Sequence, residues 1–316
     1  MKNLFLIALA LFTLVFTSCK KDEPPTPTPE PTTSNLSGMF TQNLNNAKQT
    51  FTFNASVYTE IVGQNGVKVL IPANSFKYAN GSTVTGTITF ELIELLDQAS
   101  MILTNKPTTS NGQILVSGGQ MKLTATQSGS PIYLKANASV SVMVPTSNPD
   151  FAMQLFDGTE NGNGQVDWIL SVDDSLGSPD SVIIVNDSLG GSWSDYYYFE
   201  FDDSTLGWIN CDYFWNNPNP QTTVTANLPT GHGQTNSNVF LHFSTINSVA
   251  GVYWNGTTFL TTGIPVGTSA TLICISEISG TYYSAFIPIT VVTNHVENPT
   301  MSVTTLADIQ ATIASL

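Results

Sequence analysis

Histidines and paired carboxylates are the side chains from which a catalytic or metal site would be built in this chain of 316 residues. His232, His242 and His295 are far apart in the sequence, so they would bind a metal only if the fold brought all three together. His242 alternates with apolar residues, which is typical of a strand. Adjacent acids such as Asp173 and Asp174 point to opposite faces of a strand and do not form an acid–base pair. Because the motifs of nucleophile elbows, zinc proteases and phosphate loops are also missing, the sequence predicts no catalytic residue, metal or cofactor.

Residues 157–167 carry oxygen-bearing side chains and glycines, a combination that suggests calcium binding. Their spacing does not fit an EF-hand loop, because no glutamate closes the frame at the twelfth position. A hairpin between strands at 153–156 and 166–170 explains the Gly and Asn residues without a metal. We therefore favour the hairpin and keep calcium binding as the alternative.

Four Asp-Ser pairs in the middle of the chain are each followed by an apolar residue or threonine. They resemble the O-glycosylation sequon of secreted proteins of the Bacteroidota, which implies that the serine carries a glycan. The alternative is that Asp-Ser pairs simply favour turns. The candidate serines are Ser175, Ser181, Ser188 and Ser204.

Cys19 follows an apolar run over residues 4–16 and the small residues Thr17 and Ser18. The run has the length of a signal-peptide core and is too short to span a bilayer. The segment resembles a bacterial lipobox, with Phe16 where leucine is usual. The resemblance implies cleavage before Cys19 and its acylation, for example with palmitate, to give a membrane anchor. An ordinary signal peptide with a chance cysteine, or a buried N-terminal helix, is the alternative.

The residues after Cys19 are polar and then rich in proline. Residues 20–23 (KKDE) resemble the start of surface lipoproteins of the Bacteroidota, in which lysine and acidic residues act as an export signal. That resemblance implies display on the outer face of the outer membrane, whereas the alternative is that these are only solvated charges. Residues 24–31 (PPTPTPEP) predict an extended spacer of ~3.1 Å per residue.

Cys211 and Cys274 are the remaining cysteines, and outside the cytoplasm they could form a disulfide. Trp215 is too close to Cys211 to complete the Cys–Trp–Cys pattern of an immunoglobulin domain. Two separately buried thiols are therefore the favoured alternative.

Aromatic residues concentrate after residue 194 and are the better indication of a binding surface. Exposed rings can stack on sugars or anchor a protein partner, but aromatic residues of strands more often fill a sandwich core. The aromatic set is Tyr196, Tyr197, Tyr198, Trp208, Tyr213, Trp215, Tyr253, Trp254, Tyr282 and Tyr283.

The charge is strongly acidic, with a formal net charge of −14. Residues 136–316 contain sixteen acids and neither Lys nor Arg. Nucleic-acid binding needs cationic side chains to contact the phosphates, so the sequence predicts that this protein does not bind nucleic acid. Docking on anionic lipid is equally disfavoured, which leaves the lipid on Cys19 as the expected membrane attachment. An acidic surface suits solubility, and binding of Ca²⁺ or cationic partners is the alternative.

Short alternating segments separated by turn residues predict an all-β fold of antiparallel sandwiches. Residues 66–76 (GVKVLIPANSF) run from an apolar strand into a proline turn, and residues 84–88 (VTGTI) and 101–103 (MIL) follow. These segments resemble a ZU5-like β-sandwich module of Bacteroidota lipoproteins. The resemblance covers about residues 50–150 and implies an interaction or structural role, with no catalytic residues to carry over.

Residues 194–316 contain about seven further strand patterns, and Asn255-Gly256 predicts a hairpin turn. They predict a second sandwich, immunoglobulin-like in size. Thr305 with Asp308 resembles a capping box and predicts a short C-terminal helix. Its apolar residues recur at helical spacing: Leu306, Ile309, Ile313 and Leu316.

Together these features predict an outward-facing, non-enzymatic lipoprotein of the outer membrane with a structural or protein-interaction role. Its partner would be an unknown surface protein or glycan. A glycan-binding accessory module that uses the second-domain aromatics is the alternative, and a hydrolase with two carboxylates facing one cleft is the third. The expected parts are a signal peptide (1–18), a lipidated cysteine and tether (19–49), a ZU5-like sandwich (50–150), an acidic connecting region (151–193) and an Ig-like sandwich with a C-terminal helix (194–316).

Overall fold

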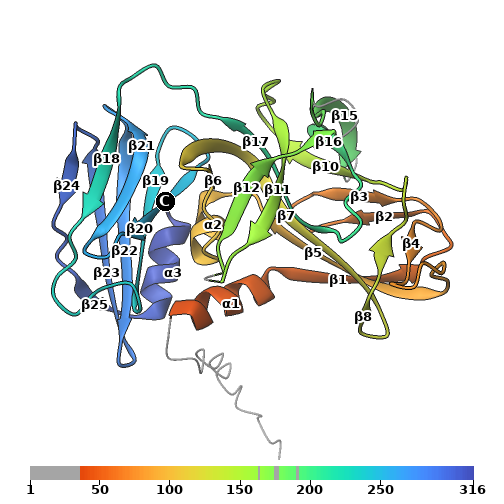
Figure 1. The fold of residues 1–316 in the computed structure, drawn as a ribbon, viewed down its shortest axis with the longest axis horizontal. Helices are drawn as coiled ribbons and strands as arrows, with labels where there is room; N and C mark the ends of the chain where they lie inside the picture. Colours follow the sequence, from red (N-terminus) through yellow and green to blue (C-terminus); the bar gives the residue numbers. More distant parts are fainter. Residues whose placement is uncertain (1–35, 163, 174–177, 190–191) are drawn as a thin grey trace, which may run out of the picture. The chain divides into compact units, whose positions relative to one another are not determined.

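The computed structural model describes residues 36–162, 164–173, 178–189 and 192–316, which belong to one compact unit. Strands in mostly antiparallel sheets make up the fold, and short helices complete it (Figure 1). The prediction of an all-β fold is therefore confirmed. Within these ranges, no helix is long and apolar enough to cross a membrane.

The first sheet has a path of six strands, with two short strands attached to its long member β7. All of its pairs are antiparallel. Across the sheet the order is β1 (Lys48–Asn54), β5 (Thr87–Leu95), β7 (Gln113–Gln127), β17 (Gly207–Phe214), β11 (Gln154–Glu160) and β12 (Val166–Leu170), with β6 (Thr109–Ser110) and β8 (Ser130–Pro131) on β7.

The second sheet has five antiparallel strands and packs against the first. Successive side chains of a strand point to opposite faces, so each sheet contributes alternate residues to one core. Phe90 and Leu92 of the first sheet meet Val142, Val144 and Phe199 of the second in this core. We call the two sheets the N-terminal sandwich. Across the second sheet the order is β15 (Ile183–Leu189), β16 (Ser192–Phe201), β10 (Val140–Thr146), β3 (Lys68–Ile71) and β2 (Thr59–Val62), and two-stranded ladders pair β4 (Phe76–Lys77) with β9 (Tyr133–Leu134) and β13 (Val172–Asp173) with β14 (Ser178–Pro179).

The C-terminal sheet has eight strands and curls on itself, because β20 pairs with β19 through Val249–Val252 and with β21 through Tyr253 and Trp254. Residues of β18 and β21 thus share a core with β19 and β22. Its one parallel pair is β18 with β24. The order is β24 (His295–Glu297), β18 (Gln221–Ala226), β21 (Phe259–Pro265), β20 (Val249–Trp254), β19 (Ser237–Phe243), β22 (Ser269–Ile278), β23 (Thr281–Thr290) and β25 (Ser302–Thr304).

Three helices line a core that the N-terminal sandwich and the C-terminal sheet share. They are α1 (Leu36–Asn46), α2 (Gln98–Leu103) and α3 (Leu306–Ala314). Phe40 of α1 meets the ring of Phe240 edge-on, with 6.4 Å between ring centroids. The predicted C-terminal helix is confirmed: Thr305 caps it by accepting from the Asp308 backbone N–H.

The strand pairing differs from the expected division of the chain in two places. Strands β16 and β17 were expected in the second sandwich, but they pair with β10 and β7 inside the N-terminal sandwich. The expected acidic connector contributes strands β11, β12 and β15 to that same sandwich. The tether was expected to reach residue 49, whereas residues 36–46 form α1 because Leu36, Met39 and Phe40 bury an apolar face.

Candidate functional site

A groove lies where α1 and the β11–β12 loop meet the start of β19 and the end of β20. It has a cavity volume of about 670 Å³, which lies within the usual range for small-ligand sites. We call it the amide-aromatic groove, after the residues that characterise it: Gln165, Gln234, Asn236, Asn238, Tyr253 and Trp254. A smaller recess of about 320 Å³ adjoins it and shares Ser37, Phe40, Asn105 and Gly162 with its lining.

The register of β19 and β20 brings two parts of the groove lining side by side. Val239 pairs with Val252, so the start of β19 lies beside the end of β20. Asn238 lies on the same face of β19 as Phe240, the residue that meets α1. The predicted Asn255-Gly256 turn is present, since the Asn255 N–H donates to the Thr258 carbonyl at 3.0 Å.

Two aromatic rings that line the groove pack against neighbouring residues of the C-terminal sheet. Trp254 packs against Phe259, with 5.2 Å between ring centroids and 67° between the planes. Tyr253 is 41% exposed, and its ring lies back over Gly251. A ring with few free rotations loses little entropy when a ligand packs on it, so both side chains are suited to binding.

The charged groups of the adjoining recess neutralise one another. Lys106 Nζ lies 3.1 Å from Glu160 Oε1 and also donates to the Gly164 carbonyl. Trp208 donates to Glu160 Oε2 at 3.1 Å, and Lys122 lies 3.3 Å from the same oxygen. Burial lowers the pKa of Lys106, against the attraction of Glu160.

Glu160 is therefore held as a carboxylate. Its desolvation alone would raise its pKa, but the Trp208 hydrogen bond and the charges of Lys106 and Lys122 lower the pKa below the ordinary value. A carboxylate in this state is a poor general acid near neutral pH. The arrangement braces the β11–β12 hairpin, which confirms the hairpin predicted for residues 157–167.

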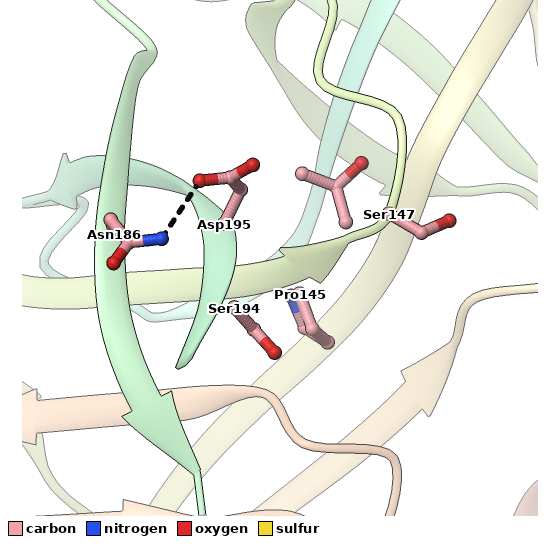
Figure 2. A pocket seen from close by; sticks show the side chains of 6 residues that line it. Pro145, Ser147, Asn186, Ser194 and Asp195 are labelled. Atoms are coloured by element: carbon pink, nitrogen blue, oxygen red, sulfur yellow. Dashed lines mark hydrogen bonds between the residues drawn. The ribbon is translucent and has the colours of Figure 1, made fainter. Parts of the chain in front are cut away.

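A second recess, of about 490 Å³, lies on the second sheet of the N-terminal sandwich beside β10, β15 and β16 (Figure 2). Pro145 and Ser147 lie on one side of it, and Asn186 donates to Asp195 Oδ1 at 3.1 Å on the other. Asp195 is the one carboxylate among its described lining residues, and neither a histidine nor a lysine accompanies it. With one carboxylate and no aromatic ring among its described lining residues, this recess is the weaker candidate for a binding site.

A buried polar cluster lies on strands β7 and β17 of the first sheet, at the irregularity between Cys211 and Asp212. Asp212 is fully buried and accepts from Asn210 Nδ2 at 2.5 Å, while Ser117 donates to Asn210 Oδ1 at 3.1 Å. Burial raises the pKa of Asp212 well above its ordinary value. Because this carboxyl is not accessible to solvent, it cannot contact a ligand at the surface, and its role is internal to the fold.

The three histidines do not converge within the described part of the chain, where no group of three or more metal-binding side chains occurs. His295 Nε2 lies 2.9 Å from Glu297, and His232 meets Tyr283 edge-on at 5.2 Å. His242 is buried in β19, where burial lowers its pKa. The strand position predicted for His242 is confirmed.

The two cysteines of the folded part are free and buried, Cys211 in the sandwich core and Cys274 in the core of the C-terminal sheet. The alternative of a disulfide is therefore contradicted, because separate sheets bury each thiol in its own core. Cys19 and Ser175 lie outside the described residues, as does the side chain of Ser188. Ser181 and Ser204 are exposed.

Of the ten aromatic residues singled out from the sequence, Tyr196, Tyr197 and Trp208 are buried. Tyr213, Trp215 and Tyr282 are partly buried and pack against the cores. Tyr253 and Trp254, which are consecutive in β20, both line the groove. Sequence reasoning missed Gln165, Gln234 and Asn238, since isolated amides carry no motif. The loop before β19, rich in Gly, Asn and Gln, was the available signal.

No protein-family model matches this chain, and a search of the curated proteins finds no match either.

Proposed function

We propose that this chain is a lipid-anchored, non-enzymatic binding protein displayed on the outer face of the outer membrane. The amide-aromatic groove is the observation that carries the binding role. It offers two held rings and several amides, and among its described lining residues no nucleophile lies beside a base. The neighbouring charges of Lys106 and Glu160 are already paired with each other.

The membrane attachment is proposed from the N-terminal residues. Cys19 follows a signal-length apolar run, and a polar, Pro-rich segment comes after it. With no cation after Lys135, the rest of the chain has no electrostatic means of holding an anionic membrane. The resemblance of residues 50–150 to a ZU5-like module supports an interaction role for the N-terminal sandwich.

Metabolic labelling with a palmitate analogue tests the anchor. The wild-type chain is expected to incorporate label, Cys19→Ser to lose it and the control Thr33→Ser to keep it. Label retained by Cys19→Ser would refute the lipid anchor. Protease added to intact cells should digest the wild-type chain if it faces outward, and full protection would refute surface display.

A photo-crosslinking amino acid tests the binding role of the groove. Placed at Gln234, it should give covalent adducts on cells, whereas at the exposed Val303 on the edge strand β25 it should not. Adducts formed at Val303 alone would refute the groove as the contact surface.

A further inference from the structure

The described lining of the amide-aromatic groove contains no Asp, Glu, Lys, Arg or His. This is informative in a chain with 23 acidic residues and a net charge of −14. A phosphate or carboxylate ligand needs cations or a cluster of N–H donors at its site. A cationic ligand would in turn be paired with carboxylates. The neutral lining therefore selects for a ligand without charge.

Several polar side chains of this lining have no partner within the described part of the chain. Gln234, Thr235 and Asn238 make no side-chain hydrogen bond there. Asn236 differs, because it accepts from the Gly233 N–H at 2.8 Å and donates to the Gly231 carbonyl at 2.8 Å. Asn236 thus pins the loop that presents its neighbours.

An amide side chain offers two donors and one acceptor group. A hydroxyl-rich ligand donates and accepts in the same way, so amides suit neighbouring hydroxyl groups better than they suit an apolar surface. Gln165 adds a third amide on the opposite wall, where its Nε2 lies 3.4 Å from Asn105 Oδ1.

The aromatic wall supplies the complementary apolar contact. Trp254 is partly exposed and packs against Phe259, while the ring of Tyr253 lies over Gly251. Flat rings pack against the C–H faces of a sugar ring, whose edges carry the hydroxyls. An uncharged groove with an aromatic ring for the C–H face and unpartnered amides for the hydroxyl groups therefore suits a neutral sugar.

We propose that the amide-aromatic groove binds a neutral carbohydrate chain, with Trp254 against a sugar face and Gln234 and Asn238 on the hydroxyls. This rests on the proposed binding function and names its ligand class. The groove shares Phe40 and Asn105 with the adjoining recess beside α1.

Affinity electrophoresis of the purified full chain in detergent tests this proposal. The gels contain one neutral polysaccharide each (a β-glucan, a galactomannan or a xylan) or acidic polygalacturonate. At least one neutral polymer is expected to retard the wild type. Trp254→Ala and the double change Gln234→Ala with Asn238→Ala are each expected to weaken that binding by at least about tenfold.

The control Phe151→Ala removes a ring that is 90% exposed and lies away from the groove, and it is expected to bind as the wild type does. Trp254→Phe keeps a ring and should retain part of the affinity, which separates stacking from a folding defect. Circular dichroism on each variant checks that the fold is intact.

Retardation by polygalacturonate alone, or neutral binding unchanged in both groove variants, would overturn the carbohydrate proposal. A crosslink from position 234 to a protein, with no retardation by any neutral polymer, would overturn it while leaving the binding function standing. Loss of neutral binding in Trp254→Ala supports it even if palmitate labelling fails, because the anchor is tested separately.

Discussion

The ring of Tyr253 lies over Gly251, two residues earlier in β20, and occupies the space that a side chain there would need. A Cβ on Gly251 would lie 2.4 Å from the Tyr253 hydroxyl oxygen. The absence of a side chain at Gly251 therefore leaves the space that the Tyr253 ring occupies.

Gly251→Ala is therefore expected to push the Tyr253 ring away and to lower the free energy of unfolding by about 1–3 kcal/mol, as overpacking does. Urea denaturation measures the stability, and the affinity gels measure the binding. Gly233→Ala is the matched control, because its Cβ would approach nothing closer than Trp254 at 4.0 Å. Equal stability of the two variants would contradict this steric account.

Glu94 holds the turn between β2 and β3. Its carboxylate accepts from Gln49 Nε2 at 2.6 Å and from the backbone N–H groups of Asn65 and Val67 at 3.0 and 2.9 Å. Glu94→Ala leaves these donors without a partner and is expected to cost about 3 kcal/mol of unfolding free energy.

Glu91 on the same strand provides the comparison. It makes a partly exposed ion pair with Lys48 at 3.1 Å, and it also accepts from Thr124. Glu91→Ala is expected to cost less than about 1 kcal/mol, because solvent screens such pairs. Urea midpoints for the two alanine variants measure the difference, and a larger loss for Glu91→Ala would refute the role given to Glu94.

Asp212 is expected to make the free energy of unfolding depend on pH. Burial raises its pKa well above the ordinary value, so the folded state holds this proton more tightly than the unfolded state. Above the unfolded pKa of about 4, unfolding releases the proton, and the free energy of unfolding falls by about 1.4 kcal/mol per pH unit from this group. The fall continues until pH passes the folded pKa.

Asp212→Asn removes this contribution, so its stability relative to wild type should increase as pH rises above about 4 and level off once pH passes the folded pKa of Asp212. Urea denaturation at each pH measures the trend. Parallel stability curves for the two proteins would show that Asp212 is ionised in the folded state.

Cys211 and Cys274 are expected to be unreactive thiols. Burial raises the pKa of Cys274 to about 12 and that of Cys211 well above its ordinary value, so almost no thiolate forms near neutral pH. In a Cys19→Ser background, a thiol reagent should label neither residue in the folded protein and both after unfolding without reductant. Absence of free thiols after unfolding would show a disulfide instead.

Local sequence patterns predicted individual strands and turns correctly. The alternation over Val239–Phe243 predicted β19, Asn255-Gly256 predicted the turn after β20, and Thr305 with Asp308 predicted the start of α3. Each depends on residues within a few positions of one another, where backbone preference and side-chain periodicity act directly.

The pairing of strands that are distant in the sequence could not be predicted from local patterns. The aromatic strand β16 and its neighbour β17 follow an acidic, Gly-rich stretch that looks like a connector, yet they pair with β10 and β7. Strand alternation specifies which side chains face a core but not which partner strand supplies the hydrogen bonds. The boundary between the N-terminal sandwich and the C-terminal sheet therefore falls after Phe214, later than predicted.

The sequence by itself determined the all-β class, the acidic charge and the short C-terminal helix, because composition and periodicity act through neighbouring residues. Only the tertiary structure decided that Tyr253 and Trp254 wall a groove while Tyr196 and Tyr197 are buried. All four lie in strands with similar patterns. Their exposure depends on what the rest of the chain packs against each face, and that is a property of distant segments.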